Sequence, residues 1–186
     1  MIPARYAATR FPAKLMQQLG RKTVIGHTYD NTVATGLFDE VYVVTDSEII
    51  FKEIEQNGGQ AIMSRKAHES GSDRIAEAAE HLDVEIIVNV QGDEPFVKKE
   101  PLEKLLQVFE GEAGKKVQVA SLMQVMKEAQ FINDPNYVKV AVDKQMNALL
   151  FSRSVIPYLR NTATAAVYYE HIGAVSYTHL TLPTIY

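Results

Sequence analysis

The chain has 186 residues, a formal net charge of -4 at pH 7 and no cysteine. This length suits one domain with its own core, and the charge gives no general attraction to nucleic acid or to an anionic membrane. The lack of cysteine excludes disulfides and cysteine-based metal sites. No apolar run approaches the ~20 residues of a membrane span, and the first residues lack the apolar stretch of a signal peptide. We therefore expect a soluble cytoplasmic protein with neither nucleic acid nor membrane as a partner.

The first half of the chain alternates between predicted strands and helices. Residues 41–45 and 85–90 are rich in β-branched side chains and predict buried strands. Apolar residues recur at helical spacing in further segments, namely residues 23–35, 47–57, 72–81 and 101–109. In the first of these segments the helical spacing is mixed. We expect Ser47 to cap the second of these, and either Ser72 or Asp73 to cap the third.

The second half predicts strands at residues 117–126, 137–142 and 146–152, the last two joined as a hairpin through Asp143 and Asn147. Strand–helix alternation before them predicts parallel βαβ units with right-handed crossovers. The expected fold is therefore α/β, with an open, doubly wound, mostly parallel sheet. Such sheets bind ligands at the carboxyl ends of their strands, and this is where residues 91–94 stand in the sequence.

The first motif with chemical potential is residues 2–14, where Arg5, Arg10 and Lys14 stand among prolines and alanines. Small residues let backbone N–H groups approach a ligand, and the cations beside them can neutralise a polyphosphate. The glycine and lysine pattern of a Walker A loop is missing. From composition alone, a solvated basic loop is an equal alternative.

The second motif is residues 88–95, in which an apolar strand ends at Gly92, Asp93 and Glu94. A carboxylate beyond a strand end is a natural ligand for Mg²⁺, which takes one or two carboxylates together with phosphate oxygens. Taken alone, the motif favours simple turn chemistry over a metal site.

The third motif, residues 64–74, opens a predicted helix whose N-terminus can face an anion or a polar ligand. Its candidate contact residues are His68, Ser70, Gly71, Ser72 and Arg74. The alternative is a solvated loop before a capped helix, and His68 by itself does not predict a metal site. Residues 134–139 and 151–157 add Lys139 and Arg153, which by themselves favour structural roles at strand ends.

In this order the motifs resemble one family, the 3-deoxy-manno-octulosonate (Kdo) cytidylyltransferases. The matching patterns are IPARYxxTRxPxK, HxSGxxR, VNVQGDEP, DPNxVKV and FSRxxIP. The resemblance runs from Ile2 to about Gly173. The CMP-sialic acid synthetases are similar in fold and in their N-terminal motif, but the forms QGDEP and FSRxxIP favour the Kdo branch.

The resemblance implies a Rossmann-like nucleotidyltransferase fold and the transfer of CMP from CTP to Kdo for lipopolysaccharide synthesis, with Mg²⁺ as cofactor and a homodimer in the full-length parent. It implies catalytic and triphosphate-binding roles for Arg5, Arg10 and Lys14, and a catalytic, metal-binding role for Asp93. It implies nucleotide contacts for His68, Ser70, Gly71, Ser72 and Arg74. It implies sugar contacts for Gln91, Glu94 and Arg153.

Two departures from the family pattern stand out. Ala13 and Ser72 replace the usual glycine and threonine, and because all of these residues are small we expect little harm. Residues 176–186 resemble nothing in the family. We therefore expect an incomplete nucleotidyltransferase domain at residues 1–175, a non-native tail at 176–186, and an inactive chain that lacks a second acidic metal ligand and part of the sugar pocket.

Other readings remain open at this point. A nucleotide-sugar glycosyltransferase domain also combines a parallel sheet with a carboxylate at a strand end, but Gly92-Asp93-Glu94 is not the Asp-x-Asp element of those enzymes. A cytidylyltransferase for sialic acid, or an inert nucleotide-binding fragment, are the further alternatives.

Overall fold

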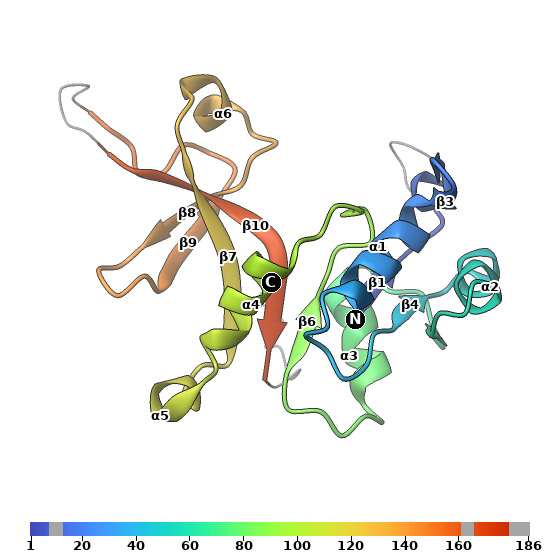
Figure 1. The fold of residues 1–186 in the computed structure, drawn as a ribbon. Coiled ribbons are helices and arrows are strands. Elements are labelled where there is room, and N and C mark those ends of the chain that lie inside the picture. Colours follow the sequence, from blue (N-terminus) through green and yellow to red (C-terminus); the bar gives the residue numbers. More distant parts are fainter. Residues whose placement is uncertain (8–12, 161–165, 179–186) are drawn as a thin grey trace. The chain divides into compact units, whose positions relative to one another are not determined.

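The computed structural model describes residues 1–7, 13–160 and 166–178, and the chain forms two compact units (Figure 1). Unit 1 comprises Met1–Ala120 and Ala174–Tyr186, and unit 2 comprises Ser121–Gly173. The sequence predicted one domain over residues 1–175 and did not predict unit 2 as a compact unit of its own. Each unit is described by itself.

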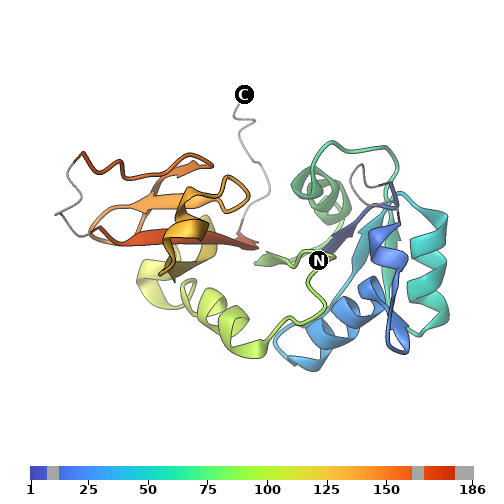
Figure 2. The ribbon, with the colours of Figure 1, turned by 90° about the horizontal axis from the view of Figure 1, so that it is seen from above.

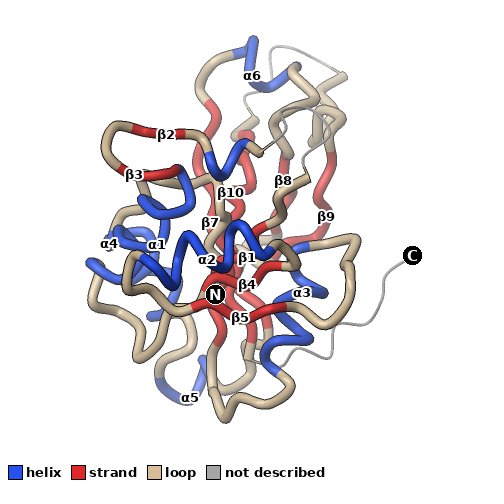
Figure 3. Tube along the Cα trace, turned by 90° about the vertical axis from the view of Figure 1, so that its right-hand side faces the viewer, coloured by secondary structure: helices blue, strands red, loops and turns tan. Residues whose placement is uncertain are grey.

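The centre of unit 1 is a parallel sheet of short strands (Figure 3). Strand β4 (Val43–Thr45) pairs in parallel with β1 (Ile2–Ala4) on one side and with β5 (Ala61–Met63) on the other. Between β1 and β4 the chain forms η1 (Lys14–Met16), a small hairpin of β2 (Gln18–Leu19) and β3 (Lys22–Thr23), and α1 (Val24–Ala34). Helix α2 (Glu48–Gln56) connects β4 to β5 and contacts α1.

Strand β6 (Ile87–Asn89) lies beside β1, on the side away from β4. The Met1 amine donates to Val88 O at 2.7 Å, and Val90 N donates to Met1 O at 3.0 Å, which is the bonding pattern of a parallel pair. Helix α3 (Gly71–Ala79) precedes β6 and packs on β1 and β4. Figure 2 shows α3 across the strands from α1 and α2. The connections through α1 and α2 and the connection through α3 therefore run in opposite directions from β1, so a topological switch point lies between β1 and β6. The predicted α/β fold with a parallel sheet is confirmed.

The helices of unit 1 begin and end for local reasons. In α2, Ile50 and Ile54 are buried on one face, and Gly58 takes a left-handed φ of 79° just after the helix. Ser47 occupies the N-cap of α2 as predicted, although its side chain makes no capping bond. The predicted cap of the next helix was wrong. Helix α3 is capped by Ser70, because its Oγ accepts the Asp73 N–H at 3.1 Å.

Unit 1 also contains α4 (Lys99–Gln107), which buries Leu102 and Leu105, and the short α5 (Gly111–Gly114). Strand β10 (Tyr168–Tyr177) reaches unit 1 with its last residues, which pair antiparallel with β6 in the register Val175↔Asn89. The predicted tail began at Ser176, yet Ser176 is fully buried within this strand.

Unit 2 is built on antiparallel pairing. Strands β8 (Lys139–Val142) and β9 (Ala148–Ser152) form the predicted hairpin, closed by Asp143 N donating to Asn147 O at 2.9 Å. Strand β10 pairs with β8 and with β7 (Val119–Met126), and α6 (Ala129–Asn133) follows β7. This antiparallel sheet adds to the parallel sheet that the sequence predicted. Among the residues described, no helix is both long and apolar enough to cross a membrane.

Candidate active site

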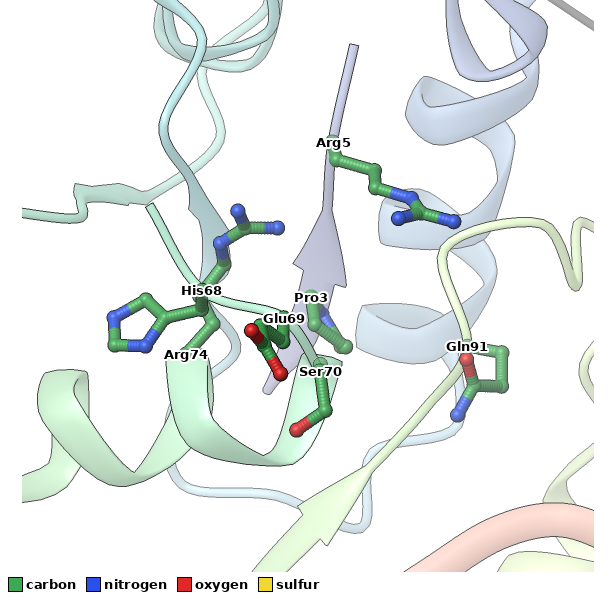
Figure 4. A pocket seen from close by; sticks show the side chains of 8 residues that line it. Pro3, Arg5, His68, Glu69, Ser70, Arg74 and Gln91 are labelled. Carbon is green, nitrogen blue, oxygen red and sulfur yellow. The ribbon is translucent and has the colours of Figure 1, made fainter. Parts of the chain in front are cut away.

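A pocket of about 210 Å³ lies at the carboxyl ends of β1 and β6, beside the switch point (Figure 4). Its lining joins three segments that are far apart in sequence: Pro3 and Arg5; His68, Glu69, Ser70, Gly71 and Arg74; and Gln91. The structure therefore brings together six of the residues that the sequence singled out. Figure 4 shows Arg5 and Gln91 on one side of the pocket, and Glu69 and Ser70 on the other.

The N-terminus of α3 forms one wall of this pocket. Ser70 Oγ accepts from Asp73 N and donates to Asp73 Oδ2 at 2.7 Å, so the first turn is closed by a reciprocal pair. A Cβ on Gly71 would lie 3.1 Å from Pro3 Cγ, so the absence of a side chain lets the helix approach β1 closely. The partial positive charge of a helix N-terminus favours an anionic or polar ligand here.

Arg74 holds three elements together at the base of the pocket. Its side chain is only 4% exposed, and it donates from Nη1 to Ala4 O at 3.0 Å and from Nη2 to Asp46 Oδ2 at 2.6 Å. Ala4 ends β1 and Asp46 follows β4, so one guanidinium joins both strand ends to α3. The predicted nucleotide contact of Arg74 stays a prediction, while the structure shows a charge already paired with Asp46.

His68 is bound to Glu77, a residue that the sequence analysis did not select. His68 Nε2 lies 2.6 Å from Glu77 Oε2, and Arg65 N donates to Glu77 Oε1 at 3.1 Å. The hydrogen bond from His68 is the main cause that lowers the pKa of the Glu77 carboxyl. The available signal was spacing, since Glu77 follows Arg74 by one turn of α3 and so shares its face.

Outside the pocket lining, Lys14 Nζ and Asp93 Oδ2 form an ion pair at 2.6 Å, with about half of each side chain exposed. Gly92 brings the loop of Asp93 against β1, because a Cβ at Gly92 would lie 2.9 Å from Pro3 O. The predicted triphosphate cation and the predicted metal ligand are therefore neighbours. Ala13, just before η1, has a left-handed φ of 54°, which explains why glycine suits this position.

Glu94 carries a second carboxyl next to Asp93. Burial raises the pKa of Glu94, the negative charge of Asp93 raises it further, and Lys14 opposes both effects. Glu94 N also donates to Gln91 O at 3.0 Å, which closes the turn after β6. The motif at residues 88–95 thus forms the turn that was predicted from it alone. It also places two carboxylates beside a lysine.

The remaining predicted residues have other settings. Ser72 Oγ lies 3.3 Å from the Tyr177 hydroxyl. Arg153 belongs to unit 2, where its Nη1 donates to Pro135 O at 2.8 Å, and the buried Lys139 holds the same loop through Asp134 O and Tyr137 O. These bonds fit the structural reading of Lys139 and Arg153. Arg10 lies outside the described residues.

A sequence profile of the family described as Cytidylyltransferase matches residues 1–180. The chain belongs to the cytidylyltransferase family. Among curated relatives, the 3-deoxy-manno-octulosonate cytidylyltransferase of Flavobacterium johnsoniae is 58% identical over 186 residues, covering 100% of this chain and 76% of the relative. The 8-amino-3,8-dideoxy-manno-octulosonate cytidylyltransferase of Shewanella pealeana is 40% identical over 188 residues, covering 99% and 76%.

A solved structure supports the same membership in the cytidylyltransferase family. The structure of CMP:2-keto-3-deoxy-manno-octonic acid synthetase complexed with CTP superposes with a TM-score of 0.88 at 37% identity, covering 95% of this chain and 72% of that one. The resemblance seen in the motifs is thereby confirmed. The alignment with the Flavobacterium relative also includes residues 176–186, so the non-native origin predicted for that segment stays a prediction.

Proposed function

We propose that this cytidylyltransferase transfers CMP from CTP to the anomeric hydroxyl of 3-deoxy-manno-octulosonate, releasing pyrophosphate, in the cytoplasmic synthesis of lipopolysaccharide. The observation that carries the proposal is the pocket at the switch point, where Arg5, the N-terminus of α3 and Gln91 meet. The similarity to a solved synthetase complexed with CTP supports cytidine triphosphate as the nucleotide. The named relatives support the sugar acid.

The transfer requires that the charge of the triphosphate is neutralised and that the two substrates are aligned. The sugar hydroxyl attacks the α-phosphorus, a new P–O bond forms, and the bond to the β-phosphate oxygen breaks to release pyrophosphate. We assign the triphosphate to the cations of Arg5, which lines the pocket, and of Arg10 and Lys14, which belong to the same motif. Because about half of Lys14 is exposed, the lysine can exchange Asp93 for a phosphate oxygen at small cost. Alignment of the two substrates and stabilisation of the phosphate charge then lower the barrier.

The acidic turn fits Mg²⁺. The cation takes oxygen ligands, commonly one or two carboxylates with phosphate oxygens, and Asp93 and Glu94 provide two carboxylates at the end of β6. Glu94 has a raised pKa partly because of the Asp93 charge, so a cation would relieve this repulsion. We assign Asp93 as the ligand, and bound Mg²⁺ would supply polarisation of the phosphoryl oxygens. Within the described ranges, no group of three or more His, Cys, Asp or Glu side chains is placed to hold a metal.

A homodimer is the assembly we propose. Its support is the apolar surface of β9 in unit 2, where Leu149, Leu150 and Phe151 are 67%, 55% and 47% exposed. Adjacent residues of a strand point to opposite faces, so β9 exposes apolar side chains on both faces of its sheet. Leu149 and Phe151 share one of these faces, and exposed apolar side chains that lie together mark interaction sites. Sedimentation velocity that shows only monomers at micromolar concentration would contradict this assignment.

A second sugar acid is a specific alternative substrate. The relative from Shewanella pealeana is named for 8-amino-3,8-dideoxy-manno-octulosonate, which carries an amine in place of one hydroxyl. The Flavobacterium relative, named for Kdo, is the more similar of the two. We therefore expect Kdo to be used in preference to the 8-amino acid, with sialic acid poorer than either. The reverse order between the first two would leave the reaction class intact and change the substrate.

The decisive experiment separates binding from transfer. Calorimetry on the 186-residue chain should show CTP binding in preference to UTP, ATP and GTP. Pyrophosphate release is then measured with CTP and each sugar acid, both for this chain and for a chimera extended by the C-terminal section of the Flavobacterium relative. We expect turnover from the chimera and little from the chain alone. Absence of CTP binding by folded protein would refute the proposal.

The Asp93→Asn substitution tests the metal ligand in the chimera. Removing this carboxylate charge should lower the rate of pyrophosphate release by about 10²-fold or more, the usual loss when a main charge-stabilising group is removed. The control is Glu103→Gln, an exposed carboxylate of α4, which should leave the rate unchanged. Normal turnover of Asp93→Asn across a Mg²⁺ titration would exclude Asp93 as the ligand.

A further inference from the structure

Glu77 and His68 are a partly buried acid–base pair beside the pocket. Their side chains are 12% and 6% exposed, and His68 Nε2 lies 2.6 Å from Glu77 Oε2. The second carboxylate oxygen, Oε1, accepts the backbone N–H of Arg65 at 3.1 Å. Both oxygens of one carboxylate therefore bind the segment that runs from β5 to α3.

This carboxylate determines where the His68 proton resides. An ionised carboxylate only accepts hydrogen bonds, so the Nε2 nitrogen of His68 must carry a hydrogen. The low pKa of Glu77 agrees with an ionised group, and the hydrogen bond from His68 is its first cause. Ring orientation and tautomer are thereby set by a residue that is not part of the pocket lining.

The His68 ring is turned away from the middle of the pocket. In Figure 4 the ring points away from Arg5 and Gln91, whereas Glu69 and Ser70 lie on the side that faces them. His68 therefore meets the pocket at its edge, while its ring nitrogen Nε2 is occupied by Glu77. This arrangement is typical of a side chain that holds a segment in place.

We propose that His68 and Glu77 act as a positioning pair, which holds residues 68–71 in the shape that binds the nucleotide. The segment is then fixed at two points: Glu77 binds Arg65 and His68, and the Ser70 cap binds Asp73. Helix α3 is itself tied to the strand ends by Arg74, so it supplies a rigid base for both. The proposal deepens the proposed function, on which its nucleotide readout rests.

A double-mutant cycle on the 186-residue chain separates positioning from direct contact. The variants are His68→Ala, Glu77→Ala and the double substitution, with CTP affinity measured by calorimetry at a temperature where all are folded. We expect each single substitution to weaken CTP binding about tenfold, within the coupling range of contacting residues, and the double to weaken it no further. Independent effects that multiply to about a hundredfold would show that His68 binds the nucleotide directly and would overturn the proposal.

Two further variants control for charge and for a general loss of structure. Glu77→Gln keeps one oxygen acceptor of similar size, so it should recover most of the affinity lost in Glu77→Ala. Glu103→Gln changes an exposed carboxylate on α4 and should bind CTP like the parent. Equal losses in Glu77→Gln and Glu77→Ala, with Glu103→Gln unaffected, would point to the charge of Glu77 and against a positioning bond.

A spectroscopic arm tests the pair without any ligand. Long-range ¹H–¹⁵N spectra of imidazole should show His68 as the Nε2–H form in the parent, and a mixture of tautomers in Glu77→Ala. An unchanged His68 signal in that variant would reject the pair itself. Absence of CTP binding by the folded parent would instead reject the proposed function, while this arm would still decide whether Glu77 holds His68.

Discussion

The charged groups on the α3 side of the site and those on the side of β1 and β6 differ in burial. On the α3 side, Arg74 is buried and the His68–Glu77 pair is partly buried, and their charged or polar atoms bind neighbouring elements. On the side of β1 and β6, Lys14 and Asp93 form an ion pair with about half of each side chain in solvent. A buried charge is committed to its partner because separation would leave it unsolvated, whereas an exposed pair can exchange partners cheaply. The first side therefore defines shape, and the second is available to ligands.

Arg74→Ala should have the largest effect among the substitutions that test this difference between the two sides. The substitution leaves Asp46 without its cation and frees the ends of β1 and β4. Removing one partner of a buried pair costs 3–5 kcal/mol, and because the Asp46 side chain is 33% exposed we expect the lower end, about 3 kcal/mol. Urea unfolding measures the loss. Lys52→Ala, which breaks an exposed pair with Glu48, is the control and should change stability by less than about 0.5 kcal/mol.

A smaller effect, of opposite sign, is expected at Ala13. Its left-handed φ of 54° is unfavourable for a residue with a Cβ by roughly 1–2 kcal/mol, while glycine loses more entropy on folding. Ala13→Gly should therefore raise the free energy of unfolding by about 0.5–1 kcal/mol. Thermal melting compares it with Ala34→Gly at the end of α1, which should lower stability instead. Destabilisation in both variants would mean that the strain at Ala13 is relieved elsewhere.

Lys14→Ala should have the least effect on folding. An exposed ion pair contributes 0–1 kcal/mol, so we expect a change in the free energy of unfolding below about 0.5 kcal/mol. CTP affinity should nevertheless fall about tenfold, because a charge-assisted phosphate contact is lost. Melting and calorimetry on the same samples decide the point. A large loss of stability with unchanged CTP affinity would make Lys14 a structural residue and erase the difference between the two sides.

The sequence predicted the longer helices of unit 1 and strands β4 and β6 because their signals are local, whereas β5 and the β2–β3 hairpin were missed. Runs of β-branched residues marked β4 and β6, and the spacing of Ile50 and Ile54 marked α2. The cap of α3 was misplaced because Ser70, Ser72 and Asp73 all have capping side chains, and the local sequence does not distinguish between them. The apolar pattern did not mark strand β10, since charged Glu170 and Gly173 interrupt it.

The site was predictable where residues follow strands, and not where a role needs tertiary contact. Arg5 and Gln91 stand directly beyond buried strands, so their meeting at one edge of the sheet follows from parallel topology. Glu77 follows no strand, and helical spacing from Arg74 could not show its partners, because these lie in a loop that must first fold back onto α3. The paired state of Arg74 was equally hidden, since Asp46 follows another strand. The motifs identified residues of the site. The packing then shows which of them bind other parts of the protein and which face the pocket.

The position of β1 between β4 and β6 also has a consequence for biosynthesis. The Met1 amine bonds to Val88, 87 residues further along the chain, so one side of β1 stays open until β6 has been made. At a synthesis rate of about 5–20 residues per second this interval lasts roughly 4 to 17 seconds. During it, β1 can pair only with β4, and the pocket has no Gln91 wall. The nascent chain therefore carries an unpaired strand edge during this interval, and such edges favour aggregation.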